Sequence, residues 1–319
     1  MSAEFVSPRP ATIRSQLVLE VASELAGRRD YPYQQARAQM RPQGPGDWTY
    51  TLFGSDAPDA IYQVAQREVD VAIINPSSVL TVAYRGAGPF AEPVAVRVIS
   101  VIPSLDWLGF AVRESTGLTS LADIKRQRYP LRVSLRGQRD HSIQLYVDEV
   151  LKAYGFALAD ILAWGGQVVY DAGTPAEPAR MGRLERGEVD AVFDEAMTRF
   201  IPPAVKLGMR LLPLEEPILG HLGDMGFRRS AIPRQTFPML PGDVPTLDFS
   251  GWPIYTHAEV ADDFVYDFCS ALDARKARIP WQQPGPLPLD VMCRDTAAGP
   301  LDVPLHPGAE RYWRDAGYL

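Results

Sequence analysis

The chain has 319 residues, with 32 lysines and arginines against 39 aspartates and glutamates, which gives a formal charge of −7 at pH 7. This length allows a large buried core and favours two domains. The negative charge argues against a general nucleic-acid-binding protein, which would need a basic surface. No apolar run is long enough to cross a membrane. We therefore expect neither nucleic acid nor a membrane as a partner.

The first ten residues have neither the basic region nor the apolar region of an export signal. We therefore expect a cytoplasmic protein; the alternative is a periplasmic protein from which a leader has been removed. The two cysteines, Cys269 and Cys293, form no C-x-x-C pair. Cys269 lies in an apolar helical run, which favours a buried thiol, but the spacing does not decide whether the two cysteines pair.

Hydrophobic patterning predicts strands and helices that alternate along the chain. A short strand at 4–6 and a turn at 7–10 precede a helix capped by Thr12. A loop at 30–47 and a strand at 48–53 follow, and Asp59 is the expected cap of the next helix. Further strands are expected at 94–102, 107–112, 131–135, 167–170, 210–214, 246–249 and 253–255. Further helices are expected at 79–84, 120–125, 143–151, 258–272 and 305–317.

One unit occurs twice, in related forms, at 68–77 and 188–196. Both copies begin Glu-Val-Asp, continue as an apolar run, and follow an amphipathic segment. Each copy predicts a helix, a tight turn and a buried strand that ends in a polar loop. Two such halves, with polar loops at the carboxyl ends of parallel strands, indicate two lobes that face one cleft. The alternative is a chance similarity between two common helix–strand units.

The order of the elements predicts the α/β class, with right-handed crossovers. The chain is expected to leave the first lobe near residue 103 and to return near 245. The predicted division is therefore a discontinuous first lobe of residues 1–104 and 245–319, with a second lobe of residues 105–244.

Four segments resemble those of a known family: 68–77, 117–125, 187–191 and 305–313. The chain resembles type II periplasmic-binding-protein folds, and it is most similar to the TAXI solute-binding subunits of TRAP transporters. The resemblance implies a two-lobed α/β fold, a ligand cleft between the lobes and, if the protein is exported, a membrane permease as partner. Residues 7–10 read Ser-Pro-Arg-Pro where the family has a glycine-rich loop, so fewer backbone N–H groups are available there to bind an anion.

The polar loop at 134–142 is the first candidate for ligand binding. It joins a predicted strand to the N-terminus of a helix, where free N–H groups and the helix dipole favour a carboxylate. Two guanidinium groups, a histidine and two hydroxyl groups are available in this loop, from Arg136, Arg139, His141, Ser134 and Ser142. The alternative is a solvated turn with a capping serine. Arg9 and Arg113 are competing candidates for the anion.

Other candidates lie in the loops that follow predicted strands. Neutral donors and acceptors from the first lobe are Ser55, Asn75, Ser77 and Ser78, for which loop capping is the alternative role. Trp107 can stack on a planar ligand or pack at the hinge. Asp194 and Glu195 can bind a ligand amine or a metal ion, or act as acid or base if burial raises a pKa; the alternative is an ordinary acidic loop.

Metal and cofactor motifs are weak or absent in the sequence. The other histidines, His221, His257 and His306, form no H-x-H or H-E-x-x-H pattern. No G-x-S-x-G, Walker A or G-x-G-x-x-G pattern occurs. We therefore expect neither a metal ion nor a cofactor.

Two functions remain open from the sequence. The first is a noncatalytic protein that binds a small organic anion, a carboxylate, in the cleft between the lobes. The second is a cytoplasmic enzyme on the same fold, such as a decarboxylase or another lyase acting on a small carboxylate. In the enzyme, Arg136 and Arg139 would hold the substrate, and His141 with Asp194 or Glu195 would move protons. Fold alone does not decide between the two.

Overall fold

The computed structural model describes residues 10–26, 35–42, 48–55, 57–281 and 287–319. They fall into two compact units, 1–36 and 37–319. The first unit contains helix α1 (Pro10–Ala26). Proline suits the first position of a helix because its missing N–H would have no partner there. The helix thus begins two residues before the predicted cap, Thr12. The predicted strand at 4–6 and Arg9 lie outside the described residues.

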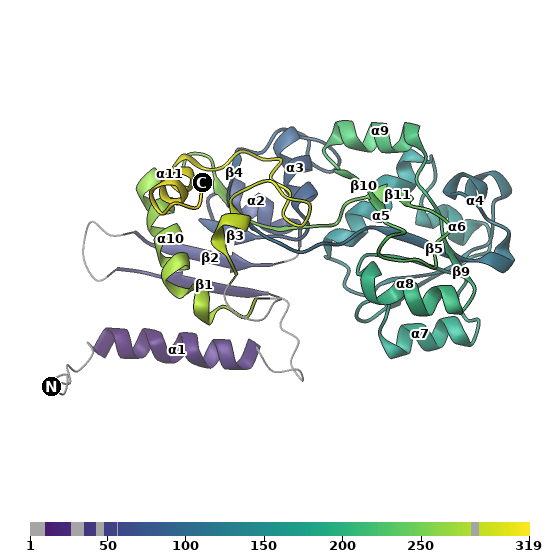
Figure 1. Cartoon of the computed structure of the whole chain (residues 1–319), viewed down its shortest axis with the longest axis horizontal. Coiled ribbons are helices and arrows are strands. Elements are labelled where there is room, and N and C mark those ends of the chain that lie inside the picture. Colours follow the sequence, from purple (N-terminus) through teal and green to yellow (C-terminus); the bar gives the residue numbers. More distant parts are fainter. Residues whose placement is uncertain (1–9, 27–34, 43–47, 56, 282–286) are drawn as a thin grey trace. The chain divides into compact units, whose positions relative to one another are not determined.

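Two five-stranded sheets and one two-stranded sheet occur among the described residues (Figure 1). In the first sheet, β2 runs parallel to β3, and β12 runs antiparallel to both β3 and β4. Its strand order is β1 (Ala36–Met40), β2 (Tyr50–Gly54), β3 (Val71–Ile73), β12 (Trp252–His257) and β4 (Val96–Ile102). The prediction of a loop at 30–47 was wrong at β1, because this exposed edge strand has no apolar alternation.

The second sheet combines parallel and antiparallel strands. β6 pairs parallel with β7 and β8, whereas β5 pairs antiparallel with β8 and β9. Its strand order is β7 (Gln167–Asp171), β6 (Arg132–Arg136), β8 (Ala191–Asp194), β5 (Gly109–Arg113) and β9 (Met209–Leu211). The antiparallel two-stranded sheet consists of β10 (Arg229–Ile232), which the sequence did not predict, and β11 (Val244–Leu247).

Helices flank both sheets of the second unit. Those adjoining the first sheet are α2 (Asp59–Ala65), α3 (Ser77–Arg85), α10 (Asp262–Arg275) and α11 (Pro307–Asp315). The others are α4 (Leu121–Gln127), α5 (Ser142–Ala153), α6 (Leu158–Ala163), α7 (Pro178–Glu185), α8 (Met197–Lys206) and α9 (Glu216–Met225). Short 3-10 helices occupy Glu114–Thr116, Lys276–Arg278 and Leu289–Met292. The predicted class, α/β with two sheets flanked by helices, is confirmed.

Some helix ends agree with the prediction from the sequence and others differ from it. Ser120 caps α4 by accepting from the Asp123 N–H at 3.3 Å, and the Asp123 carboxylate accepts from the Ser120 N–H in return. This is the capping box that the Ser-Leu-Ala-Asp pattern indicates. The predicted cap of α2, Asp59, is instead the first helical residue and follows Pro58. Helix α8 was not predicted from the sequence, because Pro202 and Pro203 lie inside it and prolines are unusual in the interior of a helix.

Neighbouring residues of each strand face different apolar clusters, as the two-residue period of a strand requires. In β3, Val71 belongs to the cluster that contains Trp313, whereas Ala72 belongs to the cluster that contains Tyr146. Both faces of the sheet are therefore covered. The two cysteines are buried and unpaired in the structure. Among the described residues, no helix is long and apolar enough to span a bilayer.

Two chain segments that connect the sheets are hydrogen-bonded to one another. The first follows β4 and includes Ser104 and Asp106; the second follows β11 and includes Phe249, Ser250 and Gly251. The Phe249 N–H donates to the Asp106 carbonyl at 3.0 Å, and the Gly251 N–H donates to the Ser104 carbonyl at 2.9 Å. The Asp106 N–H donates to the Ser250 hydroxyl at 3.0 Å. These hydrogen bonds hold the two crossing segments against one another, next to the cavity described below.

Candidate functional site

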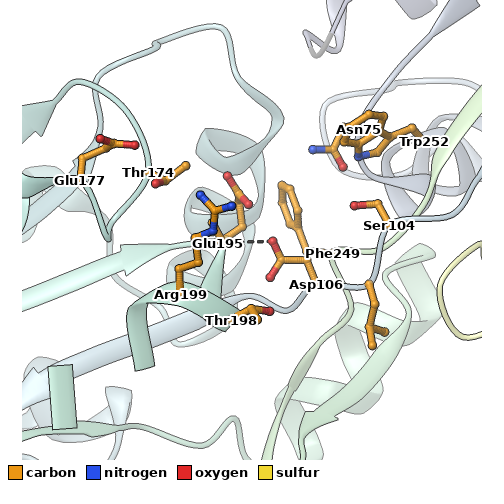
Figure 2. A pocket seen from close by; sticks show the side chains of 12 residues that line it. Asn75, Ser104, Asp106, Thr174, Glu177, Glu195, Thr198, Arg199, Phe249 and Trp252 are labelled. Atoms are coloured by element: carbon orange, nitrogen blue, oxygen red, sulfur yellow. Dashed lines mark hydrogen bonds between the residues drawn. The ribbon is translucent and has the colours of Figure 1, made fainter. Parts of the chain in front are cut away.

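A cavity of about 600 Å³ lies where the two crossing segments meet the ends of the sheets. Asn75 and Trp252 line it from the first sheet, and Ser104, Leu105, Asp106 and Phe249 line it from the crossing segments. The second sheet and its helices contribute Thr174, Glu177, Glu195, Ala196, Thr198 and Arg199. Figure 2 shows Asn75 and Trp252 on one side of the cavity, opposite Thr174, Glu177 and Arg199.

Asp106 binds the N-terminus of α8. Its carboxylate accepts hydrogen bonds from the N–H groups of Ala196, at 2.8 Å, and Met197, at 3.2 Å. Ala196 is in the left-handed conformation, with φ of 62°, and it turns the chain from β8 into the helix. A carboxylate at a helix N-terminus is stabilised by free N–H groups and by the helix dipole. The crossing segment is therefore attached to the second sheet by a charged contact at the cavity wall.

Arg136, the last residue of β6, is already paired inside the protein. Its Nη2 lies 3.0 Å from Asp194 Oδ1, and the same nitrogen donates to Glu195 Oε1. Arg180 also donates to Asp194, and its Nε donates to the Ser134 hydroxyl at 3.2 Å. All of these side chains are buried. Since Asp194 and Glu195 already accept hydrogen bonds from Arg136, its guanidinium is a poor candidate for binding a solute anion.

A side-chain hydrogen bond joins Glu195 to Asp106. Burial raises the pKa of Glu195 well above its usual range, although the neighbouring Arg136 acts in the opposite direction. Burial also raises the pKa of Asp106. Two acidic groups in this contact cannot both be ionised without repulsion, so we infer that they share one proton.

The remaining predicted residues of the 134–142 loop lie away from this cavity. Ser134 donates to Asp171 at 2.8 Å, and Ser142 is the buried first residue of α5. Arg139 lies over the Tyr170 ring, 3.7 Å from its centroid. His141 accepts from the Ile143 N–H at 3.1 Å and so caps α5. Arg139 and His141 line a separate cavity of about 250 Å³.

Several other candidates have structural contacts. Ser55 accepts from the Ala57 N–H at 3.0 Å, and Ser78 accepts from the Arg228 N–H at 3.1 Å. Ser77 is the buried first residue of α3. Trp107 is buried and packs edge-to-face on Phe237, with ring centroids 6.1 Å apart. Arg113, a competing candidate for the anion, donates to the Val189 carbonyl at 3.3 Å.

Of the predicted site residues, Asn75 and Glu195 line the larger cavity. Both were found because they directly follow the two related strands. The sequence reasoning missed Asp106, Phe249, Trp252 and Arg199, among others. A usable signal existed for Asp106, which lies in the segment predicted to leave the first lobe, whereas Phe249 was predicted as the end of a strand. Phe249, Trp252 and Arg199 gave no comparable signal.

The described part of the chain contains no group of three or more histidine, cysteine, aspartate or glutamate side chains arranged to hold a metal ion. The three residues suggested for proton transfer are also not gathered in one place. Glu195 lines the cavity, Asp194 is fully buried between two arginines, and His141 lines the separate, smaller cavity.

Comparison with known proteins gives one family match and several distant structural similarities. The model of the NMT1-like family matches residues 54–317. The alkanesulfonate-binding protein from Xanthomonas axonopodis pv. citri, solved with bound MOPS, is 15% identical over 70% of this chain and 61% of that chain, with a TM-score of 0.33. This chain thus spans about three fifths of that protein.

Two further solved structures are similar to the same degree. A glycine betaine/L-proline-binding protein of an ABC transporter from Borrelia burgdorferi is 12% identical over 68% of this chain and 66% of that chain, with a TM-score of 0.36. The binding component of an ABC phosphonate transporter from Pseudomonas aeruginosa is 9% identical over 86% and 72%, with a TM-score of 0.36. At these TM-scores the similarities support no conclusion about the ligand of this chain.

Proposed function

From the premise that the chain belongs to the NMT1-like family, we propose that it is a noncatalytic protein that binds a small organic solute. The observation that carries the proposal is the cavity of about 600 Å³, whose wall combines residues of both sheets and both crossing segments. Cavities of this size are typical of small-molecule sites.

The lining residues supply the two kinds of contact that a solute needs. Phe249 and Trp252 offer aromatic faces, while Asn75 and the hydroxyls of Thr174 and Thr198 offer hydrogen bonds. The residues proposed for an enzyme do not share one cavity, so we do not propose a lyase. If the protein is exported, we propose a membrane permease as the partner that receives the solute.

We also propose that, within the second unit, residues 37–104 and 245–319 act as one lobe and residues 105–244 as the other. In support, the chain passes from the first sheet to the second through the segment with Ser104 and Asp106, and returns through the segment with Phe249 and Gly251. A solute held between such lobes would contact residues of both, as the composition of the cavity wall allows.

Trp252→Ala tests the location of the site. A panel of small carboxylates, sulfonates and amines is screened by thermal unfolding, since a ligand at 100 times its Kd adds about 2.7 kcal/mol of stability. For compounds that bind, loss of the ring should weaken affinity about fivefold, because a stacked aromatic contact contributes roughly 1 kcal/mol. The matched control is Trp164→Ala, a half-buried tryptophan outside the cavity. Equal affinities for the two variants would place the solute elsewhere.

For a carboxylate solute, Arg199 becomes the proposed anchor in place of Arg136 and Arg139. It is the one guanidinium among the described residues that line the cavity. Arg199→Gln should weaken the binding of carboxylates about fivefold, because an exposed ion pair contributes roughly 1 kcal/mol. Arg234→Gln, at an exposed arginine outside the cavity, is the matched control and should have no effect. Calorimetry that gives the same Kd for both variants would remove Arg199 from the site.

A further inference from the structure

The groups that would ordinarily receive an anion at this cavity are occupied by carboxylates of the protein itself. Asp106 accepts from the first N–H groups of α8. Arg136 is bound by Asp194 and Glu195. An incoming anion would therefore have to displace a buried internal contact in order to use either position, and breaking such a contact is costly.

What remains exposed to the cavity is mainly negative. Among the described residues that line it, the carboxyl groups are Asp106, Glu177 and Glu195, against one guanidinium, Arg199. Glu195 is only 8% exposed, whereas Arg199 is open to solvent. Electrostatic interactions are stronger where water is excluded. The most buried ionisable side chain of the lining is therefore a carboxyl group, that of Glu195.

Two further features of the wall also suit a cation. Phe249 and Trp252 line the cavity, and the faces of aromatic rings attract cations, tryptophan most strongly. Asn75 lines the same cavity, and its Oδ1 atom is buried and has no hydrogen-bond partner in the described part of the chain. A buried acceptor without a partner is costly.

The charge balance of the buried network indicates how a cation would be accommodated. The network links Asp106, Glu195 and Asp194 to Arg136 and Arg180 through hydrogen bonds. Three carboxyl groups face two guanidinium groups, so the network is neutral when it holds one proton. A cationic ligand can take the place of that proton without leaving a net charge in the wall.

We propose that the solute carries a cationic nitrogen, such as a protonated amine, that is bound by Asp106 and Glu195, and that its binding releases the proton these two residues share. This inference rests on the proposed solute-binding function and specifies the chemistry of the same site. In the balanced step, R–NH₃⁺ enters the cavity with its own protons, the Glu195 carboxyl O–H bond breaks, and that proton leaves to solvent. No bond of the solute changes.

The test uses three probes with the same ring and different charges: benzylamine, which is protonated at neutral pH, benzyl alcohol and benzoate. Calorimetry on the full chain should give benzylamine the lowest Kd, about tenfold below that of benzyl alcohol, because one desolvated charged contact is gained. The heat of benzylamine binding, measured in two buffers with different ionisation enthalpies, should show proton release. Affinity for benzylamine should increase as pH rises, because the shared proton leaves more easily.

Glu195→Gln keeps the size of the side chain and removes its charge. This variant should lose most of the preference for benzylamine over benzyl alcohol and should release no proton. The matched control, Glu185→Gln, changes an exposed glutamate of α7 outside the cavity and should behave as the wild type does.

The possible results separate this inference from the proposed function. If benzoate or benzyl alcohol binds as tightly as benzylamine, the cavity accepts solutes but the cationic preference is overturned. If none of the three probes binds, the inference is likewise overturned, and the proposed function is judged by the panel with Trp252→Ala and Trp164→Ala. Benzylamine binding that is unchanged in Glu195→Gln would also overturn it.

Discussion

Replacing Asp194 by asparagine is expected to lower the free energy of unfolding by about 3–5 kcal/mol, the usual cost of breaking one side of a buried ion pair. Asp194 is fully buried and accepts from both Arg136 and Arg180. Asparagine has almost the same volume, so the loss comes from charge and not from packing. Two guanidinium groups would then compete for the remaining carboxylates. Urea-induced unfolding, followed by circular dichroism, measures the difference.

The matched control is Asp263→Asn, which makes the same change in an exposed pair. Asp263 lies 2.6 Å from Arg311, and its side chain is 79% exposed. Ion pairs of this kind contribute about 0–1 kcal/mol. If Asp194→Asn destabilises the chain no more than Asp263→Asn does, the buried network contributes no more to stability than a surface ion pair. Arg136 could then leave its internal carboxylate partners to bind a solute anion.

The second large effect is a dependence of stability on pH that originates at Asp248. Burial raises the pKa of Asp248 from its ordinary value of 3.8 to about 6. Between these two values the folded protein keeps a proton that the unfolded chain has lost. The contribution of this group to stability is therefore greatest below pH ~4 and decreases as pH rises through ~6. A change of about two pKa units corresponds to about 3 kcal/mol.

Asp248→Asn should remove this contribution, because asparagine does not titrate. The Asp248 carboxylate accepts from the Ser250 N–H at 3.0 Å and from the Ser250 hydroxyl at 2.7 Å. The asparagine carbonyl can keep the first contact, and its amide can donate to the hydroxyl oxygen. We expect the free energy of unfolding, measured in denaturant between about pH 4 and pH 7, to fall less steeply in the variant. Parallel curves for variant and wild type would contradict this assignment.

Local patterns in the sequence determined most of the secondary structure. The apolar run within 68–74 predicted β3, the corresponding run after residue 188 predicted β8, and the Ser120–Asp123 capping box predicted the start of α4. These elements depend on interactions among residues close in the chain, so their patterns are visible without the fold. The same two runs located Asn75 and Glu195 at the ends of their strands.

The tertiary structure alone decided which charges remain available to a solute. The sequence shows Arg136 in a polar loop, but not that Asp194 and Glu195, 58 and 59 residues away, accept hydrogen bonds from it. It also does not show that Asp106 reaches the N-terminus of α8, 90 residues further along the chain. Such pairs depend on how distant strands and crossing segments are brought together. A charged side chain has the same local pattern whether it is paired or free, so the sequence identified the polar loops and only the fold assigned their partners.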